Sequence, residues 1–275
     1  MTKEMAPGAS PHANWRDPEQ YRPLLDFDCV GWAGQWLSRN PEFLERLRQI
    51  DCVWRLNGEG ILACRDSCPL VRWGLRCCVL ASAANFLWLP DVNPFVLLVE
   101  ADSAMSAADT FALHQCPLLK AVVQRADDGQ HLLFSDGQRH LQVQVTRGDA
   151  LAGIVCLCCQ LRGLRAFENK SVSLRRLCYL HRRGRLLKSL YPPERRARRW
   201  IEMLRAWDGR TTGASQRDIA LALFGDRAAT TDWEAGYRTR MQRLLRGARA
   251  LVDGGYLKIL IPDRKGKAGL AESDG

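Results

Sequence analysis

The sequence contains no apolar run long enough to cross a membrane. Its longest apolar stretches, at 79–89, 95–99 and 154–159, fall well short of the roughly 20 residues that a spanning helix needs. The first dozen residues also lack the apolar centre of a secretion signal. We therefore expect a cytoplasmic protein with no membrane partner, in which residues 1–13 form a disordered lead and residues 263–275 a disordered tail.

Catalytic motifs are also missing. The sequence has no HExxH, no GxSxG and no phosphate-binding loop, and its five histidines are scattered. His131 and His140 flank Asp136, but a surface hairpin explains that spacing without any chemistry. A nuclease or integrase would need clustered carboxylates or a tyrosine nucleophile within a supporting motif, and neither occurs. We therefore expect no enzymatic activity and no cofactor.

The cysteines do not form the framework of a small secreted domain. Their number is odd, at 11, and the chain is long, so we interpret them as reduced thiols. Most lie in apolar stretches, where cysteine behaves as a small apolar side chain. One alternative stays open, because Cys64, Cys68, Cys77 and Cys78 offer thiolates for Zn²⁺, although their spacing matches no standard zinc motif.

Positive charge is concentrated in one part of the chain. Residues 1–161 contain 14 basic and 18 acidic side chains, whereas residues 162–275 contain 26 basic and 12 acidic ones. Such asymmetry is typical of a segment that binds a polyanion, most often nucleic acid. The acidic first part is the better candidate for protein contacts, among them a contact with RNA polymerase.

The pattern before residue 163 predicts two regions. Residues 14–55 favour short helices joined by prolines, with more aromatic side chains than so short a segment can bury alone. We expect this region to pack on the middle of the chain, and the alternative is an exposed docking surface. Residues 56–162 are strand-rich, with a hairpin predicted around Asp136-Gly137 and a helix within 104–126.

The pattern of residues 163–262 is helical and basic. One helix is predicted through Leu174, Leu177 and Leu180, and a second one between residues 194 and 207. The predicted fold class is therefore α+β. It combines a small helical N-terminal region, a strand-rich middle region and a mainly helical C-terminal DNA-binding domain, winged or similar to a helix-turn-helix.

The segment GASQRDIALALFG (213–225) has the local signals of a well-defined helix. Ser215 and Asp218 have the spacing of a capping box, and Gly225 suits a left-handed C-cap. Between these two ends, four apolar residues form a stripe along one face of the helix: Ile219, Ala220, Leu223 and Phe224. We predict that this is the first helix of a DNA-binding pair.

The second helix of the pair is predicted to begin at Thr231, with Glu234 completing a second capping box, and to run to Val252 with a break at Gly236. Its core-facing stripe consists of Tyr237, Met241, Leu244, Leu245, Ala248, Leu251 and Val252. Its remaining surface carries Arg238, Arg240, Arg243, Arg246 and Arg249. The connection between the helices is longer than the roughly three to four residues of the tightest helix-turn-helix, so a winged or looser variant fits better. The YLKILI segment (256–261) favours a strand, as in a wing.

A basic helix of this kind fits the major groove, where arginine donates two parallel hydrogen bonds to guanine. We predict contacts with bases from Arg240, Arg243 and Arg246. Contacts with phosphates or flanking bases are predicted for Ser215, Gln216, Arg217, Arg238, Arg249, Arg195, Arg196, Arg198 and Arg199. Further phosphate candidates are Arg182, Arg183, Arg185 and Lys188. The alternative is that these arginines only keep the helices soluble.

The same segments resemble a family. GASQRDIALALFG, the DW at 232–233 and RMQRLLRGARALVDGGY (240–256) resemble the C-terminal DNA-binding domain of proteobacterial transcriptional regulators that include excision activators of integrative and conjugative elements. NWRDPEQY and GWAGQWLSRNPEF resemble the transcriptional-regulator-like domain that accompanies it. RWGLRC, FLWLPDVNP and SDGQRHLQVQV are similar too, so the likeness covers about residues 14 to 262.

The resemblance implies a cytoplasmic activator that binds double-stranded DNA at a promoter for excision or transfer of a mobile element. It also implies a small protein antagonist. We therefore predict a sequence-specific DNA-binding transcriptional regulator. The alternative is a DNA-binding adaptor of a conjugation or replication complex, which would show no preference for one site over random DNA.

Overall fold

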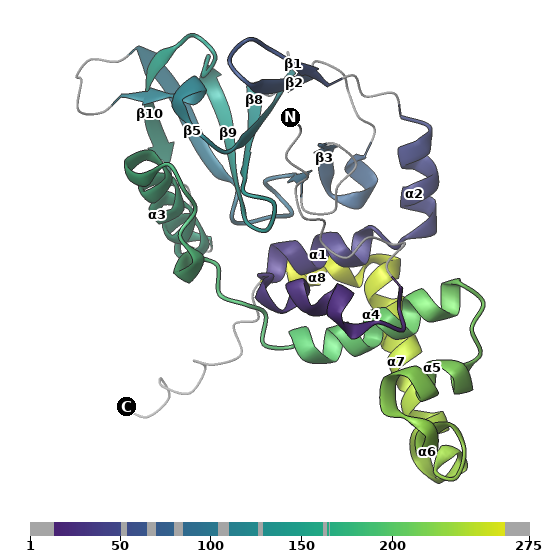
Figure 1. The fold of residues 1–275 in the computed structure, drawn as a ribbon. Coiled ribbons are helices and arrows are strands. Elements are labelled where there is room, and N and C mark those ends of the chain that lie inside the picture. The colour runs from purple at the N-terminus through teal and green to yellow at the C-terminus, as the bar shows by residue number, and fades with distance from the viewer. Residues whose placement is uncertain are drawn as a thin grey trace, which may run out of the picture.

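The chain forms a large mixed sheet and a helical assembly that lie next to each other, as the computed structural model in Figure 1 shows. The lead 1–13 and the tail 263–275 lie outside the described residues. The structure describes residues 14–50, 54–64, 70–79, 85–103, 110–125, 129–161, 164 and 166–261.

The longer helices lie at the two ends of the chain. Before the sheet come the 3-10 helix η1 (Pro18–Asp26) and the helices α1 (Cys29–Leu37) and α2 (Pro41–Arg48). After the sheet come α3 (Phe167–Arg183), α4 (Ala197–Thr211), α5 (Gln216–Phe224), α6 (Asp226–Ala229), α7 (Arg238–Ala250) and α8 (Tyr256–Ile259). Side-chain N-caps determine where α1 and α2 begin. Asp28 accepts hydrogen bonds from two N–H groups of α1, and Asn40 accepts one from the N–H of Phe43 in α2. The short helices predicted for the N-terminal region are confirmed.

Within the described residues the strands form one sheet of eight strands and one of two. The large sheet has the order β1-β2-β7-β8-β9-β5-β10-β6, in which the pairs β2/β7 and β5/β9 are parallel and the others antiparallel. Its strands are β1 (Arg55–Leu56), β2 (Ile61–Cys64), β5 (Leu97–Ser103), β6 (Phe111–Ala112), β7 (Leu119–Arg125), β8 (Gly129–Ser135), β9 (His140–Gly148) and β10 (Ile154–Gln160). The small sheet pairs β3 (Leu75–Cys78) with β4 (Phe86–Trp88). The predicted α+β class is confirmed.

The predicted hairpin joins β8 to β9. Its loop is held by Asp136, whose carboxylate accepts hydrogen bonds from the backbone N–H groups of Gln138 at 3.0 Å and Arg139 at 2.7 Å. Gly137 has a φ of 95°, which glycine adopts without strain. The turn residues thus act as the sequence predicts, and the hairpin is confirmed.

The helix predicted within residues 104–126 is wrong for the part that the structure describes. Residues 111–112 form β6 and residues 119–125 form β7, with one 3-10 turn at 113–115 between them. The apolar run was too short to separate a helix from a strand by periodicity. In β7 the β-branched Val122 and Val123 point to opposite faces of the sheet and are both buried, an arrangement that favours a strand.

Alternate residues of the central strands enter two different cores. In β8, Leu132 and Phe134 belong to one core and Leu133 to the other. The first, here called the sheet core, also contains Leu97, Val99, Val143, Leu177 and Leu180. The second, here called the helical core, also contains Trp32, Trp36, Trp88, Trp200, Met241 and Tyr256.

Helix α3 covers the sheet core. Leu177 and Leu180 are buried there, and Leu174 is half-buried, so the predicted leucine face is confirmed. Polar side chains attach the same helix to the chain just before β5: Ser173 donates a hydrogen bond of 2.7 Å to the carbonyl of Phe95, and Lys170 donates one to the carbonyl of Val96.

The N-terminal region packs chiefly on the C-terminal helices. The sequence pattern predicts instead that it packs on the middle of the chain. Trp32 of α1 lies 5.3 Å from Trp200 of α4, measured between ring centroids. Helix α8 also packs on α1. A smaller contact with the middle exists, because Phe43 of α2 lies against Trp73 and Phe86. The aromatic residues are therefore buried between the two ends of the chain, which the sequence places far apart.

In the part of the chain that the structure describes, every helix is too short or too polar to span a membrane.

Candidate nucleic-acid interface

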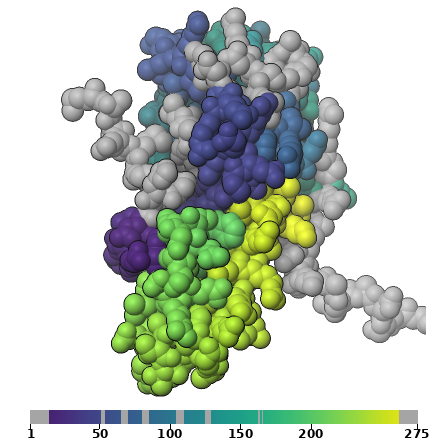
Figure 2. All heavy atoms as spheres, turned by 90° about the vertical axis from the view of Figure 1, so that its right-hand side faces the viewer, coloured from purple at the N-terminus to yellow at the C-terminus, as the bar shows by residue number. Residues whose placement is uncertain are grey.

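The candidate interface is built by α4, α5 and α7, which pack against one another. These helices and α6 form the end of the molecule that lies away from the sheet (Figures 1 and 2). Figure 2 shows the same residues as a projecting lower half of the molecule. A projecting surface of this kind is accessible to a large ligand.

Helix α5 begins as the sequence predicts and ends before Gly225, but this glycine does not adopt the predicted left-handed helical conformation, because its ψ is 179°. The Ser215 hydroxyl accepts a hydrogen bond from the N–H of Asp218 at 3.2 Å, and the Asp218 carboxylate accepts one from the N–H of Ser215 at 3.0 Å. The Ser215 hydroxyl also donates to the Asp218 carboxylate at 2.6 Å, and this bond, together with the one from the Ser215 N–H, lowers the pKa of Asp218. Gly225 follows the helix with a φ of 86°, and its N–H donates to the carbonyl of Leu221. The capping box is confirmed.

The second capping box, predicted for Thr231 and Glu234, is wrong. Within the described residues these two side chains form no bond with each other; the chain instead makes the short helix α6 and then a wide turn, η6 (Trp233–Tyr237). Gly236 lies within that turn and has a non-helical φ of 153°, so the predicted break is confirmed. The connection between α5 and α7 is consequently folded rather than extended.

The apolar face of α7 is buried as predicted. Met241, Leu244, Ala248 and Val252 lie in the helical core, and Tyr237, Leu245 and Leu251 are half-buried beside them. Gly247 leaves room for the Met203 side chain of α4, since a Cβ there would lie 2.9 Å from the terminal carbon of that methionine. This packing fixes which side of α7 faces the solvent.

All five arginines of α7 are exposed, but they differ in their partners. Arg238 pairs with Glu234 at 3.4 Å and Arg249 with Asp253 at 3.2 Å, each one helical turn away. Arg240 pairs with Glu202 of α4 at 3.3 Å. Arg243 and Arg246 have no hydrogen bond, ion pair or ring contact within the described residues.

The structure adds two residues that the sequence analysis missed. Thr239 and Gln242 are exposed on α7, and helical spacing places them beside Arg243 and Arg246 on the side opposite the buried stripe. A prediction from charge considers only the charged residues on this side of the helix and therefore misses these two. The same i, i+3 and i+4 spacing that defines the apolar stripe would have found them.

The basic run before and within α4 is exposed. Arg195, Arg198 and Arg199 have no side-chain partner among the residues that the structure describes, whereas Arg196 pairs with Glu194 at 2.9 Å and lies over the ring of Trp200. Arg205, in contrast, is buried and donates to the carbonyls of Trp15 and Arg16. Part of the positive charge therefore holds the fold together and is not available to a ligand.

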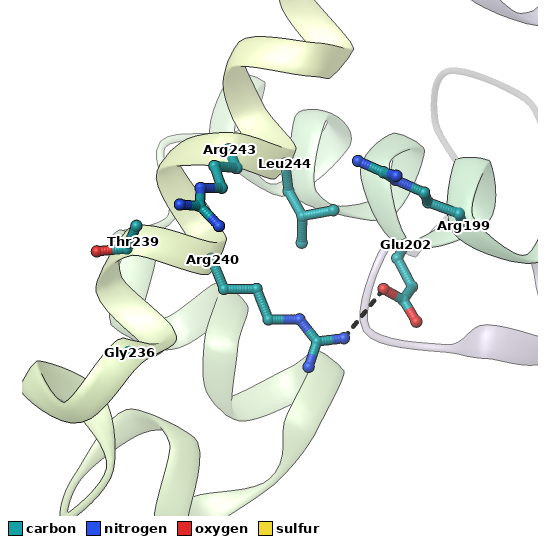
Figure 3. Close-up of a pocket in the computed structure, with 7 residues that line it drawn as sticks. All are labelled: Arg199, Glu202, Gly236, Thr239, Arg240, Arg243 and Leu244. Atoms are coloured by element: carbon teal, nitrogen blue, oxygen red, sulfur yellow. Dashed lines mark hydrogen bonds and ion pairs between the residues drawn. The ribbon is translucent and has the colours of Figure 1, made fainter.

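A pocket of about 600 Å³ separates α4 from α7 and is open to solvent. Its lining residues are Arg199, Glu202, Gly236, Thr239, Arg240, Arg243 and Leu244. Figure 3 shows Arg240 extending from α7 toward Glu202, with Arg199 on the opposite wall. The pocket thus joins the basic run of α4 to the exposed side of α7.

The other predicted residues lie around this surface. At the start of α5, Ser215 and Arg217 are exposed and Gln216 is half-buried; the Arg217 guanidinium lies 5.6 Å from the ring of Trp233. At the end of α3 and after it, Arg182, Arg183, Arg185 and Lys188 are exposed, with Lys188 paired to Asp26 at 3.0 Å.

The predicted wing strand is wrong. Residues 256–259 form α8, and Tyr256, Ile259 and Leu260 are buried at i, i+3 and i+4. The segment has apolar residues that suit either structure, and its contact with α1 favours the helix.

No group of three or more metal-binding side chains is close enough to hold an ion within the described ranges. Of the four cysteines considered for zinc, Cys64, Cys77 and Cys78 are buried, and Cys68 lies outside the described residues.

Comparisons with protein-family models identify two domains. Residues 165–260 match the RovC DNA-binding domain, a family described as "T6SS, Transcription factor, DNA binding domain". Residues 14–78 match the "Proteobacterial transcriptional regulator-like domain". No curated protein matches the chain. The protein is a DNA-binding transcriptional regulator, and DNA is its partner.

Proposed function

We propose that this regulator binds DNA in a sequence-specific manner and that α7 enters the major groove. The observation that carries the proposal is the side of α7 opposite the buried stripe, where Arg243 and Arg246 lie beside Thr239 and Gln242. Arginine suits guanine, glutamine suits adenine, and the threonine methyl suits the methyl group of thymine. Because Arg243 and Arg246 have no partner among the described residues, they can reach a base without first breaking an ion pair seen there.

The remaining basic residues fit contacts with the DNA backbone. We propose such contacts for Arg238 and Arg249, which flank the central side of α7, and for the basic run of α4. Ser215, Gln216 and Arg217 lie at the N-terminus of α5, where helix N–H groups favour a phosphate. Arg240, predicted from the sequence to contact a base, is directed toward Glu202 and is better placed for a phosphate.

The more specific parts of the proposal rest on the resemblance of the sequence to the family of proteobacterial transcriptional regulators. We propose a helix-turn-helix-like arrangement of α5 and α7, an activating and non-enzymatic role, and a place in the cytoplasm. The proposed targets are genes for excision or transfer of a mobile element, with RNA polymerase and a small antagonist as protein partners. The matched family description adds T6SS genes as a second class of targets. We also propose that the helical N-terminal region ends at residue 55 and that the DNA-binding domain begins at residue 163.

Selection from a random duplex library, with the full-length protein at about 150 mM salt, tests the proposal. Enrichment of one motif supports a sequence-specific regulator, and the genes beside that motif identify its targets. Retention of DNA without a motif supports the adaptor instead.

Arg246→Ala is the informative variant in this selection, and Arg48→Ala in α2 is its control. Arg48 is exposed and remote, so its loss removes the same charge without touching the interface. Specific binding requires that Arg246→Ala change the enriched motif and that Arg48→Ala leave it intact. If the motif is the same in both variants, α7 is not the helix that contacts bases.

A further inference from the structure

The pocket between α4 and α7 carries more positive charge than the protein neutralises. Three guanidinium groups, from Arg199, Arg240 and Arg243, line it together with a single carboxylate, from Glu202. Arg199 and Arg243 have no partner among the described residues, so only one of the three cations is paired. The Thr239 side chain adds a neutral hydrogen-bond donor.

We propose that this pocket binds a phosphate group and that Glu202, by holding Arg240, keeps its affinity low. The proposal rests on the proposed function, because the favoured source of the phosphate is the backbone of the DNA that α7 contacts. Guanidinium groups match phosphate oxygens with pairs of parallel hydrogen bonds. Arg243 links the two surfaces, since it lines the pocket and also belongs to the exposed side of α7.

The geometry of Arg240 explains why Glu202 controls the site. The Arg240 guanidinium lies 3.8 Å from the centroid of the Phe224 ring, which holds it at the pocket. Its ion pair with Glu202 is half-exposed and 3.3 Å long, a geometry that contributes little to stability. Neutralising Glu202 therefore leaves Arg240 in place and frees its donors for a phosphate.

A DNA backbone fits the pocket better than a small anion does. At about 600 Å³ the pocket is several times larger than a phosphate group and is open on one side. Its lining residue Arg199 belongs to the basic run of α4, which begins with Arg195 in the turn before the helix. A free phosphorylated small molecule has the same chemistry and forms the second arm of the test.

The experiment measures the affinity of the full-length protein for its selected site and for a random duplex over a salt series. Glu202→Gln is compared with Glu45→Gln, which neutralises another exposed, arginine-paired carboxylate in α2, outside the proposed interface. We expect Glu202→Gln to strengthen binding to both duplexes by about threefold and to steepen the salt slope by up to about one. Glu45→Gln should give no comparable gain.

Arg199→Ala should weaken binding to both duplexes by about threefold and reduce the salt slope by about one. The control is Arg48→Ala, which should leave both quantities unchanged. The proposal is overturned if Glu202→Gln equals Glu45→Gln and Arg199→Ala leaves the salt slope unchanged.

The second arm titrates the protein with inorganic phosphate and with pyrophosphate by calorimetry. If the protein binds phosphate or pyrophosphate, Arg199→Ala abolishes that binding and the pocket variants leave the DNA affinities unchanged, the pocket binds a free phosphorylated ligand. If neither the calorimetry nor the DNA measurements show an effect of the pocket, the site is refuted. Arg246→Ala keeps the two proposals apart, because Arg246 does not line the pocket. If Arg246→Ala leaves the sequence preference intact while the pocket variants behave as expected, the pocket stands and the base-contacting role of α7 fails.

Discussion

Arg39 and Asp208 form a buried ion pair that joins the N-terminal region to α4. Two parallel hydrogen bonds, of 2.7 Å from Nε and 2.9 Å from a terminal nitrogen, connect the guanidinium to the carboxylate. Tyr21 donates a third bond of 2.7 Å to Asp208, and the same burial and negative charge raise the pKa of the tyrosine. The side chains of Arg39 and Asp208 are 2% and 4% exposed, so neither charge has water as a substitute partner.

The first prediction concerns this pair. Asp208→Ala should lower the free energy of unfolding by about 3–5 kcal/mol, because it removes the carboxylate that accepts two hydrogen bonds from the buried Arg39 guanidinium. Urea denaturation followed by tryptophan fluorescence measures the loss. Glu45→Ala, which breaks the exposed pair with Arg48, should cost less than about 1 kcal/mol. Equal losses in the two variants would contradict the role given to burial.

The second prediction is that the C-terminal helices need the N-terminal region in order to fold. In the intact chain Trp200 contacts Trp32 and Trp36, and Arg205 donates to backbone carbonyls near residue 15. A fragment of residues 192–261 exposes these groups and should show no cooperative thermal transition. Adding a peptide of residues 14–50 should restore one. A sharp transition of the fragment alone would show that its own core suffices.

The third prediction separates base contacts from phosphate contacts. Arg243→Ala should cost about 1–3 kcal/mol on the selected site and relax the preference for one base pair. Arg198→Ala should weaken specific and random duplexes alike and lower the salt slope by about one. Fluorescence anisotropy on both duplexes makes the measurement. A uniform loss with Arg243→Ala would make that residue a phosphate contact.

The fourth prediction concerns pH. His140 of β9 is buried, and burial lowers its pKa below the usual 6.5, against the opposing effect of Asp28 and Asp136 and with the help of Arg176. The unfolded chain therefore binds a proton near pH 6.5 that the folded chain does not bind, so the stabilising contribution is complete above that pH and falls as the pH decreases below it. The loss should approach about 1.4 kcal/mol per pH unit.

Unfolding free energies between pH 7.5 and 5, chosen to span the usual histidine range of about 6.5, give the test. His140→Gln should reduce the pH dependence, whereas His181→Gln, at an exposed position of α3, should leave it as in the wild type. If His140→Gln retains the full dependence, other groups cause it.

The sequence predicted those features whose interactions are local. The capping box of Ser215 and Asp218 and the turn from Asp136 to Arg139 each join residues that lie three positions apart, so both follow from residue type and spacing. The apolar stripe of α7 and the arginines on its other side follow from helical periodicity in the same way. The concentration of basic residues after residue 161 needs no structure at all.

Only the tertiary structure decided what depends on residues far apart. The Arg39–Asp208 pair spans 169 positions, and nothing in the local sequence of either residue indicates the other. The pairing of Arg240 with Glu202, 38 positions away, distinguishes one arginine of α7 from its neighbours in a way that a helical wheel cannot. Residues 256–259 became a helix because their contact with α1 buries the i, i+3 and i+4 positions. The sequence by itself therefore determined that the protein presents a basic helix, and tertiary packing determined that Arg240 pairs with α4 while Arg243 and Arg246 have no partner among the residues that the structure describes.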